Sequence, residues 1–466
     1  MLWYDSTKCE NTRSECALQR VFAIFLILKT SRTEARTLNP YFKENRYTIP
    51  LFLLLLSAFL IPAIAAQKLL IPMDLSQRDH LKAYGIAYWT VKQGGKAEWL
   101  LNYRSGSFLC DHYSQLERLC RIRGVSFELV SGNQTARIYA EIESANMEVV
   151  PLEKAPRIAV YAPEGYEPWD DAVMMALTYA EIPYDQIYDD DVLKGLLNEY
   201  DWLHLHHEDF TGQYGKFYAS YKNSAWYKEN KAKNEARAGR WEFPTVSEMK
   251  KAVAREIKGY VVKGGFLFAM CSGTDSFDIA LSAEGVDMVG IPYDGDPPDP
   301  DAQKKLDYSK CLAFSKFKLI FDPKIYEFSD IDMTKESGRG WKGEAGDYFT
   351  LFEFSAKYDP VPTMLTQDHT SVVKGFMGQT TSYRRSLVKP SVTIMGEYEG
   401  RDEVKYIHGN IGQGFWTFYG GHDPEDYRHL VGDPPTNLEL HKNSPGYRLI
   451  LNNVLFPAAK KKKLKT

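Results

Sequence analysis

The sequence predicts an α/β fold, in which a parallel sheet carries helices on both faces and is joined to a smaller N-terminal α/β domain. Strand-like and helix-like segments alternate along residues 67–290, and alternation of this kind is typical of parallel sheets. Residues 266–270 contain no polar side chain, which is expected of a strand in the middle of a sheet. At 466 residues the chain is also long enough for two domains.

The first predicted domain covers residues 67–154. The pattern predicts strands at 68–75, 97–109, 125–130 and 147–152, and helices at 76–93, 115–122 and 136–145. Residues 154–156, Lys-Ala-Pro, form the expected boundary.

The second predicted domain covers residues 155–457, with insertions at 210–244 and 290–375. Strands are expected at 157–163, 184–188, 200–209, 266–271, 391–398 and 404–421, and helices at 168–182, 245–263 and 444–456. Thr245 and Glu248 form a capping box at the start of one of these helices. The prolines of the second insertion predict irregular structure there.

The N-terminal region has the features of an export signal. Lys43 and Arg46 precede an apolar run that ends in small residues, so residues 43–66 are interpreted as a secretory signal peptide cleaved near Ala65 or Ala66. A signal anchor is the alternative, because the run is nearly long enough to span a bilayer. We expect an exported, periplasmic protein with no stable membrane span after cleavage. Residues 1–42 are interpreted as a non-functional or over-extended N-terminus.

Charge gives little indication of a macromolecular partner. The formal net charge is −4, and no basic stretch interleaved with aromatic residues occurs within the body of the chain, so no nucleic-acid partner is expected. The strongly basic tail, residues 458–466, is interpreted as a solvated end. Neither the oligomeric state nor the disulfide status of Cys110, Cys120 and Cys311 follows from the sequence.

The turn at Cys271 allows two interpretations. In one, residues 271–276 form a phosphate-binding loop at a helix N-terminus. In the other, Cys271 is a nucleophile on a strained strand-to-helix turn, which requires small residues at the positions that Ala269 and Gly273 occupy. A helix N-terminus lowers the pKa of a thiol. The nucleophile interpretation therefore expects an activated thiolate.

Two further polar clusters follow predicted strands. His422 comes after the strand ending at residue 421, with Asp423 and Glu425 as alternative carboxylates to orient its imidazole. Residues 206–209, His-His-Glu-Asp, end another strand. Because carboxyl ends of parallel strands share one edge, we expect all three clusters to meet there. The predicted catalytic residues are Cys271, His422 and Glu425, and the predicted substrate or oxyanion region comprises His206, His207, Glu208, Asp209, Ser272, Gly273 and Asp423.

These motifs resemble a known superfamily. The sequence Ala269-Met270-Cys271-Ser272-Gly273 is similar to the nucleophile elbow of class I glutamine amidotransferases, and residues 421–425 resemble their His-Pro-Glu element with one extra residue, Asp423. Residues 421–425 with the final helix resemble the ThuA-like branch. Residues 204–219, 349–367 and 421–427 resemble an exported bacterial family commonly labelled asparagine synthetase B. The resemblance implies a flavodoxin-like, class I glutamine amidotransferase-like fold.

The leading functional hypothesis is hydrolysis or transfer of a carboxamide nitrogen from a small-molecule or peptide substrate, with the insertion 210–244 as a lid. No cofactor is expected. The alternative implied by the asparagine synthetase B label is ATP-dependent amide synthesis, and ATP would be required only in that case. A third hypothesis is a non-catalytic periplasmic binding module. Cys271 is alternatively a buried structural residue, and the histidines around residue 206 are alternatively metal ligands, although no metal is predicted.

Overall fold

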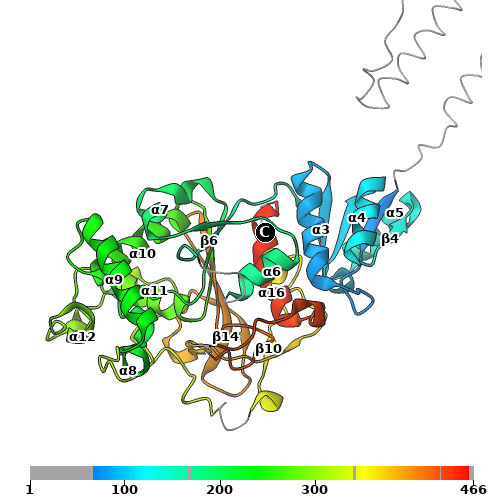
Figure 1. Ribbon diagram of the computed structural model, residues 1–466. Helices are drawn as coiled ribbons and strands as arrows, with labels where there is room; N and C mark the ends of the chain where they lie inside the picture. The colour runs from blue at the N-terminus through cyan, green and yellow to red at the C-terminus, as the bar shows by residue number, and fades with distance from the viewer. Residues whose placement is uncertain (1–66, 166–170, 339–342, 431, 461–466) are drawn as a thin grey trace, which may run out of the picture. The chain divides into compact units, whose positions relative to one another are not determined.

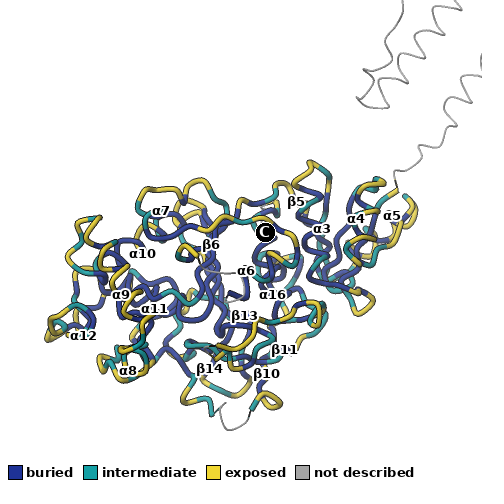
Figure 2. The backbone as a smooth tube through the Cα atoms, viewed as in Figure 1, coloured by how far each residue is buried: buried dark blue, intermediate teal, exposed yellow. Residues whose placement is uncertain are grey.

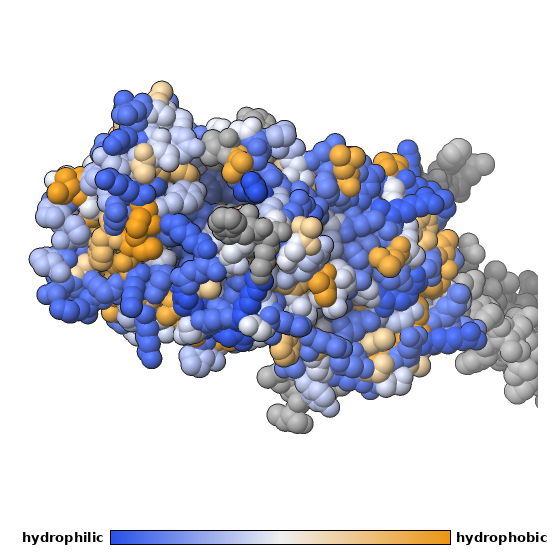
Figure 3. Space-filling view, turned by 90° about the horizontal axis from the view of Figure 1, so that it is seen from below, coloured by the Kyte–Doolittle hydropathy of each residue, from blue (hydrophilic) through white to orange (hydrophobic). Residues whose placement is uncertain are grey.

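The computed structural model describes residues 67–165, 171–338, 343–430 and 432–460, which form two β-sheets with helices packed around them (Figure 1). The predicted signal peptide at 43–66, its cleavage site, residues 1–42 and most of the basic tail lie outside the described residues. Among the described helices, none combines the length and apolar character that crossing a membrane requires. On the face shown in Figure 3, hydrophilic residues predominate and hydrophobic residues form smaller patches.

The first sheet has five strands in the order β4-β1-β3-β2-β5, and every pairing within it is antiparallel. Its strands are β1 (Lys68–Ile71), β2 (Ala97–Leu101), β3 (Ser107–Asp111), β4 (Glu128–Val130) and β5 (Glu148–Leu152). Its helices are α3 (His80–Lys92), α4 (Ser114–Arg123) and α5 (Gly132–Ser144).

The predicted strand at 97–109 is two strands, which explains why the parallel prediction was wrong for this sheet. Asn102, Arg104, Ser105 and Gly106 have φ values of 62°, 44°, 62° and 87°. Such a run of positive φ values reverses the chain. Strands β2 and β3 therefore form a hairpin, in which Leu100 pairs with Ser107.

The second sheet has ten strands, nine of them in the order β11-β10-β13-β14-β15-β9-β8-β6-β7. Its strands are β6 (Ile158–Tyr161), β7 (Asp185–Ile187), β8 (Trp202–Leu205), β9 (Phe266–Met270), β10 (Tyr348–Leu351), β11 (Val372–Lys374), β12 (Tyr383–Arg384), β13 (Thr393–Glu397), β14 (Glu403–Ile411) and β15 (Gly414–Tyr419). Its helices are α6 (Ala172–Tyr179), α7 (Asp189–Leu193), α8 (Tyr218–Tyr221), α9 (Ala225–Arg240), α10 (Val246–Val262), α11 (Ser272–Ser282), α12 (Ile291–Asp294), α13 (Ala302–Lys305), α15 (Pro360–Leu365) and α16 (Pro445–Leu455).

This second sheet is mixed, so the predicted flavodoxin-like parallel sheet with helices on both faces is wrong. Pairings among β7, β6, β8, β9 and β15 are parallel, but those that connect β15, β14, β13, β10 and β11 are antiparallel, as is the pairing of β12 with β14. The predicted strand at 404–421 is itself a hairpin, which turns at Gly412 with φ of 60°. Part of the insertion predicted to be irregular supplies β10 and β11.

The parallel strands separate two hydrophobic cores. Along β6, Ile158 and Val160 join the core that contains α6 and α16, whereas Ala159 and Tyr161 join the core that contains α10 and α11. This division follows from the alternation of side chains along a strand. Strands β6, β8 and β9 are buried throughout, as Figure 2 shows for β6. Polar side chains that follow them are therefore held on a rigid support.

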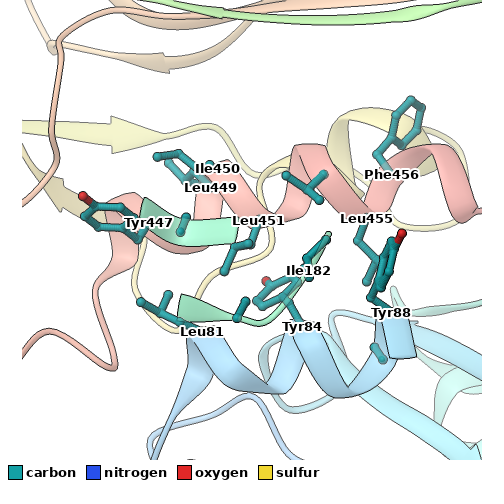
Figure 4. Close-up of a cluster of buried hydrophobic side chains, with 14 of the residues drawn as sticks. Leu81, Tyr84, Tyr88, Ile182, Tyr447, Leu449, Ile450, Leu451, Leu455 and Phe456 are labelled. Carbon is teal, nitrogen blue, oxygen red and sulfur yellow. The ribbon is translucent and has the colours of Figure 1, made fainter. Parts of the chain in front are cut away.

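Helix α16 connects the two sheets. It packs against α3 of the first sheet and against α6, and Figure 4 shows Leu451 and Leu455 of α16 beside Tyr84 and Tyr88 of α3. At the end of β5, Leu152 also forms an antiparallel bridge with Ala459, near the C-terminus. Both sheets belong to the same compact unit of the chain.

Candidate functional site

Cys271 lies on a sharp turn between β9 and α11, as the sequence predicts. Its φ and ψ are 49° and −139°, a combination that costs about 1–3 kcal/mol for a non-glycine residue. Position 273 requires glycine, because a Cβ there would lie only 2.3 Å from the carbonyl oxygen of His206. The N–H of Gly273 donates to that same oxygen at 2.6 Å. The turn is thus locked to the end of β8.

The thiol of Cys271 is buried and protonated at neutral pH. Its residue is 1% exposed, and burial raises the pKa of Cys271 to about 11, against the lowering effect of the N–H groups of Thr380, Ser272 and Gln379. The expected lowering of the pKa by the helix N-terminus is therefore outweighed by desolvation. The thiol is free, as are the buried thiols of Cys110, Cys120 and Cys311.

The segment around Gln379 covers this thiol. The backbone N–H of Gln379 donates to Sγ of Cys271 at 3.2 Å. Its side-chain amide donates to the carbonyl oxygens of Gly215, at 2.8 Å, and Tyr326, at 3.2 Å. Gln379 therefore ties the insertion after β8 to the segment over the thiol. No local pattern in the sequence pointed to this residue.

His422 comes to the same edge of the sheet, as expected. The N–H of Cys271 donates to the carbonyl oxygen of Gly421 at 3.2 Å, so the two turns are adjacent. The centroid of the His422 ring lies 4.2 Å from that of His206, 5.5 Å from that of His207 and 3.6 Å from that of His429. The sequence analysis did not include His429 in the site.

The two carboxylates predicted to orient His422 make other contacts. Glu425 Oε2 lies 2.9 Å from Nδ1 of His441, so its ion pair is with a different histidine. Asp423 Oδ1 accepts from the hydroxyl of Tyr447 at 2.9 Å, and Oδ2 accepts from Thr436 at 2.7 Å. Both carboxylates therefore brace the turn that carries His422.

His206 is supported by a buried network that the sequence analysis missed. Its Nδ1 lies 3.2 Å from Nε2 of His204 and 3.5 Å from Oδ1 of Asp171. Asp171 caps α6 by accepting from the N–H groups of Val173 and Met174. Burial and the neighbouring imidazoles of His207 and His204 hold the pKa of His206 well below its ordinary value. An aspartate immediately before the apolar helix was the available signal for this contact.

The remaining predicted residues, Glu208, Asp209 and Ser272, lie in different surroundings. Glu208 Oε2 accepts from the hydroxyl of Tyr188 at 2.9 Å. Asp209 accepts from the N–H groups of Thr211 and Gly215, which fixes the start of the insertion. Ser272 is fully buried within α11. Glu208 and His207 both line a cavity, whereas Ser272 does not.

That cavity has a volume of about 520 Å³ and lies beneath α9. Asp190, which follows β7, holds α9 in place by accepting from Arg237, Arg240 and Trp241. A slightly larger cavity of about 570 Å³ is bordered by the opposite ends of β9 and β15, far from these polar clusters along the strands. Other residues lining the cavity beneath α9 include Tyr188, Tyr214, Phe217, Trp226, Asn230, Lys233 and Lys250.

Comparison with known proteins does not identify a family. No protein-family model matches the sequence, and no curated protein matches it. Two solved structures of cytoplasmic proteins from Salmonella typhimurium are similar, one with 11% identity and a TM-score of 0.32 and the other with 12% identity and a TM-score of 0.34. The matches cover 66% and 65% of this chain and 100% of each Salmonella protein. At these TM-scores the likenesses define neither the fold nor the activity.

Proposed function

We propose that the protein is a hydrolase that cleaves a carboxamide at the edge formed by the ends of β8, β9 and β15, with Cys271 as the nucleophile. The observation that carries this proposal is the backbone of Cys271, whose φ of 49° is a strained conformation for a non-glycine residue. Such strain persists where the surrounding structure over-determines it, and it is concentrated at functional sites.

In the proposed reaction, Sγ of Cys271 attacks the carbonyl carbon after its proton passes to an imidazole, for which His422 is the candidate. The C–N bond then breaks, the nitrogen takes the proton, and ammonia or an amine leaves. Water hydrolyses the resulting thioester and restores the thiol. The N–H of Ser272 is the candidate oxyanion donor from α11, because the N–H of Gly273 already bonds to His206.

The reaction requires the thiol to be uncovered. Cys271 is 1% exposed and lies beneath Gln379, which contacts the insertion through Gly215. We infer that movement of this segment connects the thiol to the cavity beneath α9. The insertion 210–244 would then act as a lid, because α9 forms one wall of the cavity.

The ATP-dependent alternative has less support. A phosphate at the turn would need free N–H groups at the start of α11. The N–H groups of Gly273 and Thr274 donate instead to the carbonyl oxygens of His206 and Cys271. All residues of α11 are buried. These two N–H groups are therefore already bonded within the protein and are not free to bind a phosphate.

The test is release of ammonia from a panel of small and peptide carboxamides by full-length protein. We expect Cys271→Ser to lower kcat/KM by at least about a thousandfold, as loss of a nucleophile does in thiol and serine hydrolases. Cys311→Ser is the matched control, because Cys311 is also buried and free. Full activity in Cys271→Ser, or equal losses in both variants, would contradict the proposal.

A further inference from the structure

Three imidazoles meet at the ends of β8 and β15. One ligand nitrogen from each of His206, His207 and His422 lies within 4.8 Å of the others. His206 and His422 are 1% and 6% exposed, while His207 borders the cavity beneath α9. From this geometry we propose that His206, His207 and His422 bind one divalent transition-metal ion of the zinc class.

His206 provides the observation that points to a ligand. Its Nε2 is buried and has no hydrogen-bond partner among the described residues. The other nitrogen, Nδ1, is engaged with His204 at 3.2 Å. A buried nitrogen without a partner is costly to a protein unless something binds it. A metal ion at this position satisfies that nitrogen.

The hydrogen bonds behind His206 select the tautomer that binds metal. Nδ1 of His204 lies 3.0 Å from the carbonyl oxygen of Phe268. Because a carbonyl only accepts, Nδ1 of His204 carries a hydrogen. Oδ1 of Asp171 lies 3.5 Å from Nδ1 of His206 and also only accepts, so it favours the tautomer with a hydrogen on Nδ1 of His206. This arrangement leaves a lone pair on Nε2 of His206 for a ligand bond.

Asp171 completes the outer support of the site. Its Oδ1 lies 3.5 Å from Nδ1 of His206 and its Oδ2 lies 3.4 Å from Nε2 of His204. Histidines that bind metal usually direct their second nitrogen at a carboxylate or carbonyl, which fixes the ring. Asp171 also accepts from two backbone N–H groups at the start of α6. We therefore place Asp171 behind the ligands and not among them.

The ligand set indicates the kind of ion. Imidazole nitrogens suit zinc, copper, iron and nickel, whereas calcium and magnesium prefer oxygen. Three protein ligands leave the fourth tetrahedral position open, which is the pattern of a catalytic site. With zinc–nitrogen bonds of about 2.0–2.1 Å, the nitrogens would lie about 3.4 Å apart. The three nitrogens, all within 4.8 Å of one another, therefore lie near the spacing that binding needs.

This inference goes beyond the proposed function and does not depend on Cys271. It does change the role of His422, because a nitrogen that holds a metal ion cannot carry protons. In the proposed reaction, hydroxide bound at the open position would then accept the thiol proton, because a zinc-class ion lowers the pKa of its bound water toward neutrality. A metal site without thiol chemistry, and thiol chemistry without a metal site, are separate outcomes.

The test uses full-length protein that has been treated with a chelator and dialysed. Calorimetric titration with Zn²⁺ is expected to give one ion per chain. Co²⁺ is expected to give the intense visible absorption of a four-coordinate ion. His206→Ala and His422→Ala should each abolish the Co²⁺ spectrum, and Asp171→Asn should weaken affinity by about 10–100-fold.

Two controls keep the result specific. His112→Ala removes an imidazole that pairs with Glu117 in the first part of the chain, and Cys271→Ala removes the nearby thiol; both should bind metal as the wild type does. X-ray absorption of the wild-type zinc complex tests the ligands without any variant and should show imidazole scattering and no sulfur. Lack of stoichiometric binding, a sulfur ligand, or an unchanged spectrum in folded His206→Ala would overturn the inference.

Discussion

The backbone N–H of Cys271 donates to the carbonyl oxygen of Gly421 at 3.2 Å. This bond continues the parallel pairing of β9 with β15, in which Met270 lies opposite Tyr419. The turn that holds the thiol and the turn that holds His422 are therefore fixed in register by one ladder of hydrogen bonds. A change in the conformation of either turn must disturb the other.

Gly421, in the second of these turns, has little room for a side chain. Its φ is 92°, and a Cβ would lie 2.5 Å from the ring of Phe376 and 2.7 Å from Nζ of Lys405. We expect Gly421→Ala to lower the free energy of unfolding by about 2–4 kcal/mol, since it adds a clash to an unfavourable φ. Urea unfolding measures the loss.

The matched control for this change is Gly400→Ala. Gly400 also has a positive φ, of 71°, but nothing lies within 4 Å of a Cβ built there. Gly400→Ala should lower the free energy of unfolding by only about 1 kcal/mol, which is the cost of the backbone strain. Equal losses in the two variants would show that the contact with Phe376 has no effect.

The pH dependence of thiol labelling tests the covering of Cys271. Because burial raises the pKa of Cys271 to about 11, its alkylation by iodoacetamide should accelerate about tenfold per pH unit between about pH 7 and 10. Gln379→Ala should accelerate labelling at every pH by loosening the cover. Gln303→Ala is the control, since its amide bonds to Tyr308 and Phe317 elsewhere. A labelling rate that levels off near neutral pH would contradict the prediction.

Asp275 makes stability depend on pH. Burial raises the pKa of Asp275 to about 8, and the nearby Asp332 adds to the effect. The folded protein thus retains a proton that the unfolded chain has lost, so this group's contribution to stability is present below about pH 4 and is lost as the pH rises toward 8. Asp275→Asn should remove that loss.

We expect the advantage of Asp275→Asn over the wild type to grow by up to about 1.4 kcal/mol per pH unit across this window. Urea unfolding at pH 5 and pH 8 measures it. Asp301→Asn, at an exposed carboxylate, is the control and should show no such trend. If the advantage of Asp275→Asn did not change with pH, the raised pKa of Asp275 would be refuted.

Asp190 should control the mobility of α9. Hydrogen bonds from Trp241 and Arg237 overcome the effect of burial and lower the pKa of Asp190, so its carboxylate is ionised at neutral pH. We expect Asp190→Ala to increase amide hydrogen exchange in residues 225–240 at least about tenfold, because the helix loses its attachment to α7. Glu199→Ala, which breaks an exposed pair with Arg157, should leave this exchange unchanged. Unchanged exchange in Asp190→Ala would contradict the proposed attachment.

The parts of the fold that were predictable have strong local signals. The helix at 245–263 was identified from its apolar spacing and its Thr245 cap, and the structure has α10 at Val246–Val262 with that cap. The buried strand before Cys271 and the helix after it were likewise predicted and are present as β9 and α11. Local pattern determines such elements because propensity, capping and burial all agree.

Strand direction was not predictable in this way. An apolar run looks the same in a parallel and an antiparallel sheet, so the reversals at residues 102–106 and 412–413 were read through as continuous strands. Asn102 and Arg104 have positive φ values without being glycine, and propensity gives little warning of that. The imidazole group was only partly predictable, because Asp171 reaches it from a distant helix cap.

The burial of Arg448 in α16 has a consequence for biosynthesis. This fully buried side chain donates to the carbonyl oxygens of Met73, at 3.0 Å, and Ser105, at 2.9 Å, which belong to the first part of the chain to be synthesised. The part of α3 that packs against α16 therefore has no permanent covering until residues 445–455 leave the ribosome. We expect the nascent chain to need chaperone protection over most of its length, and fragments cut near residue 155 to aggregate rather than fold.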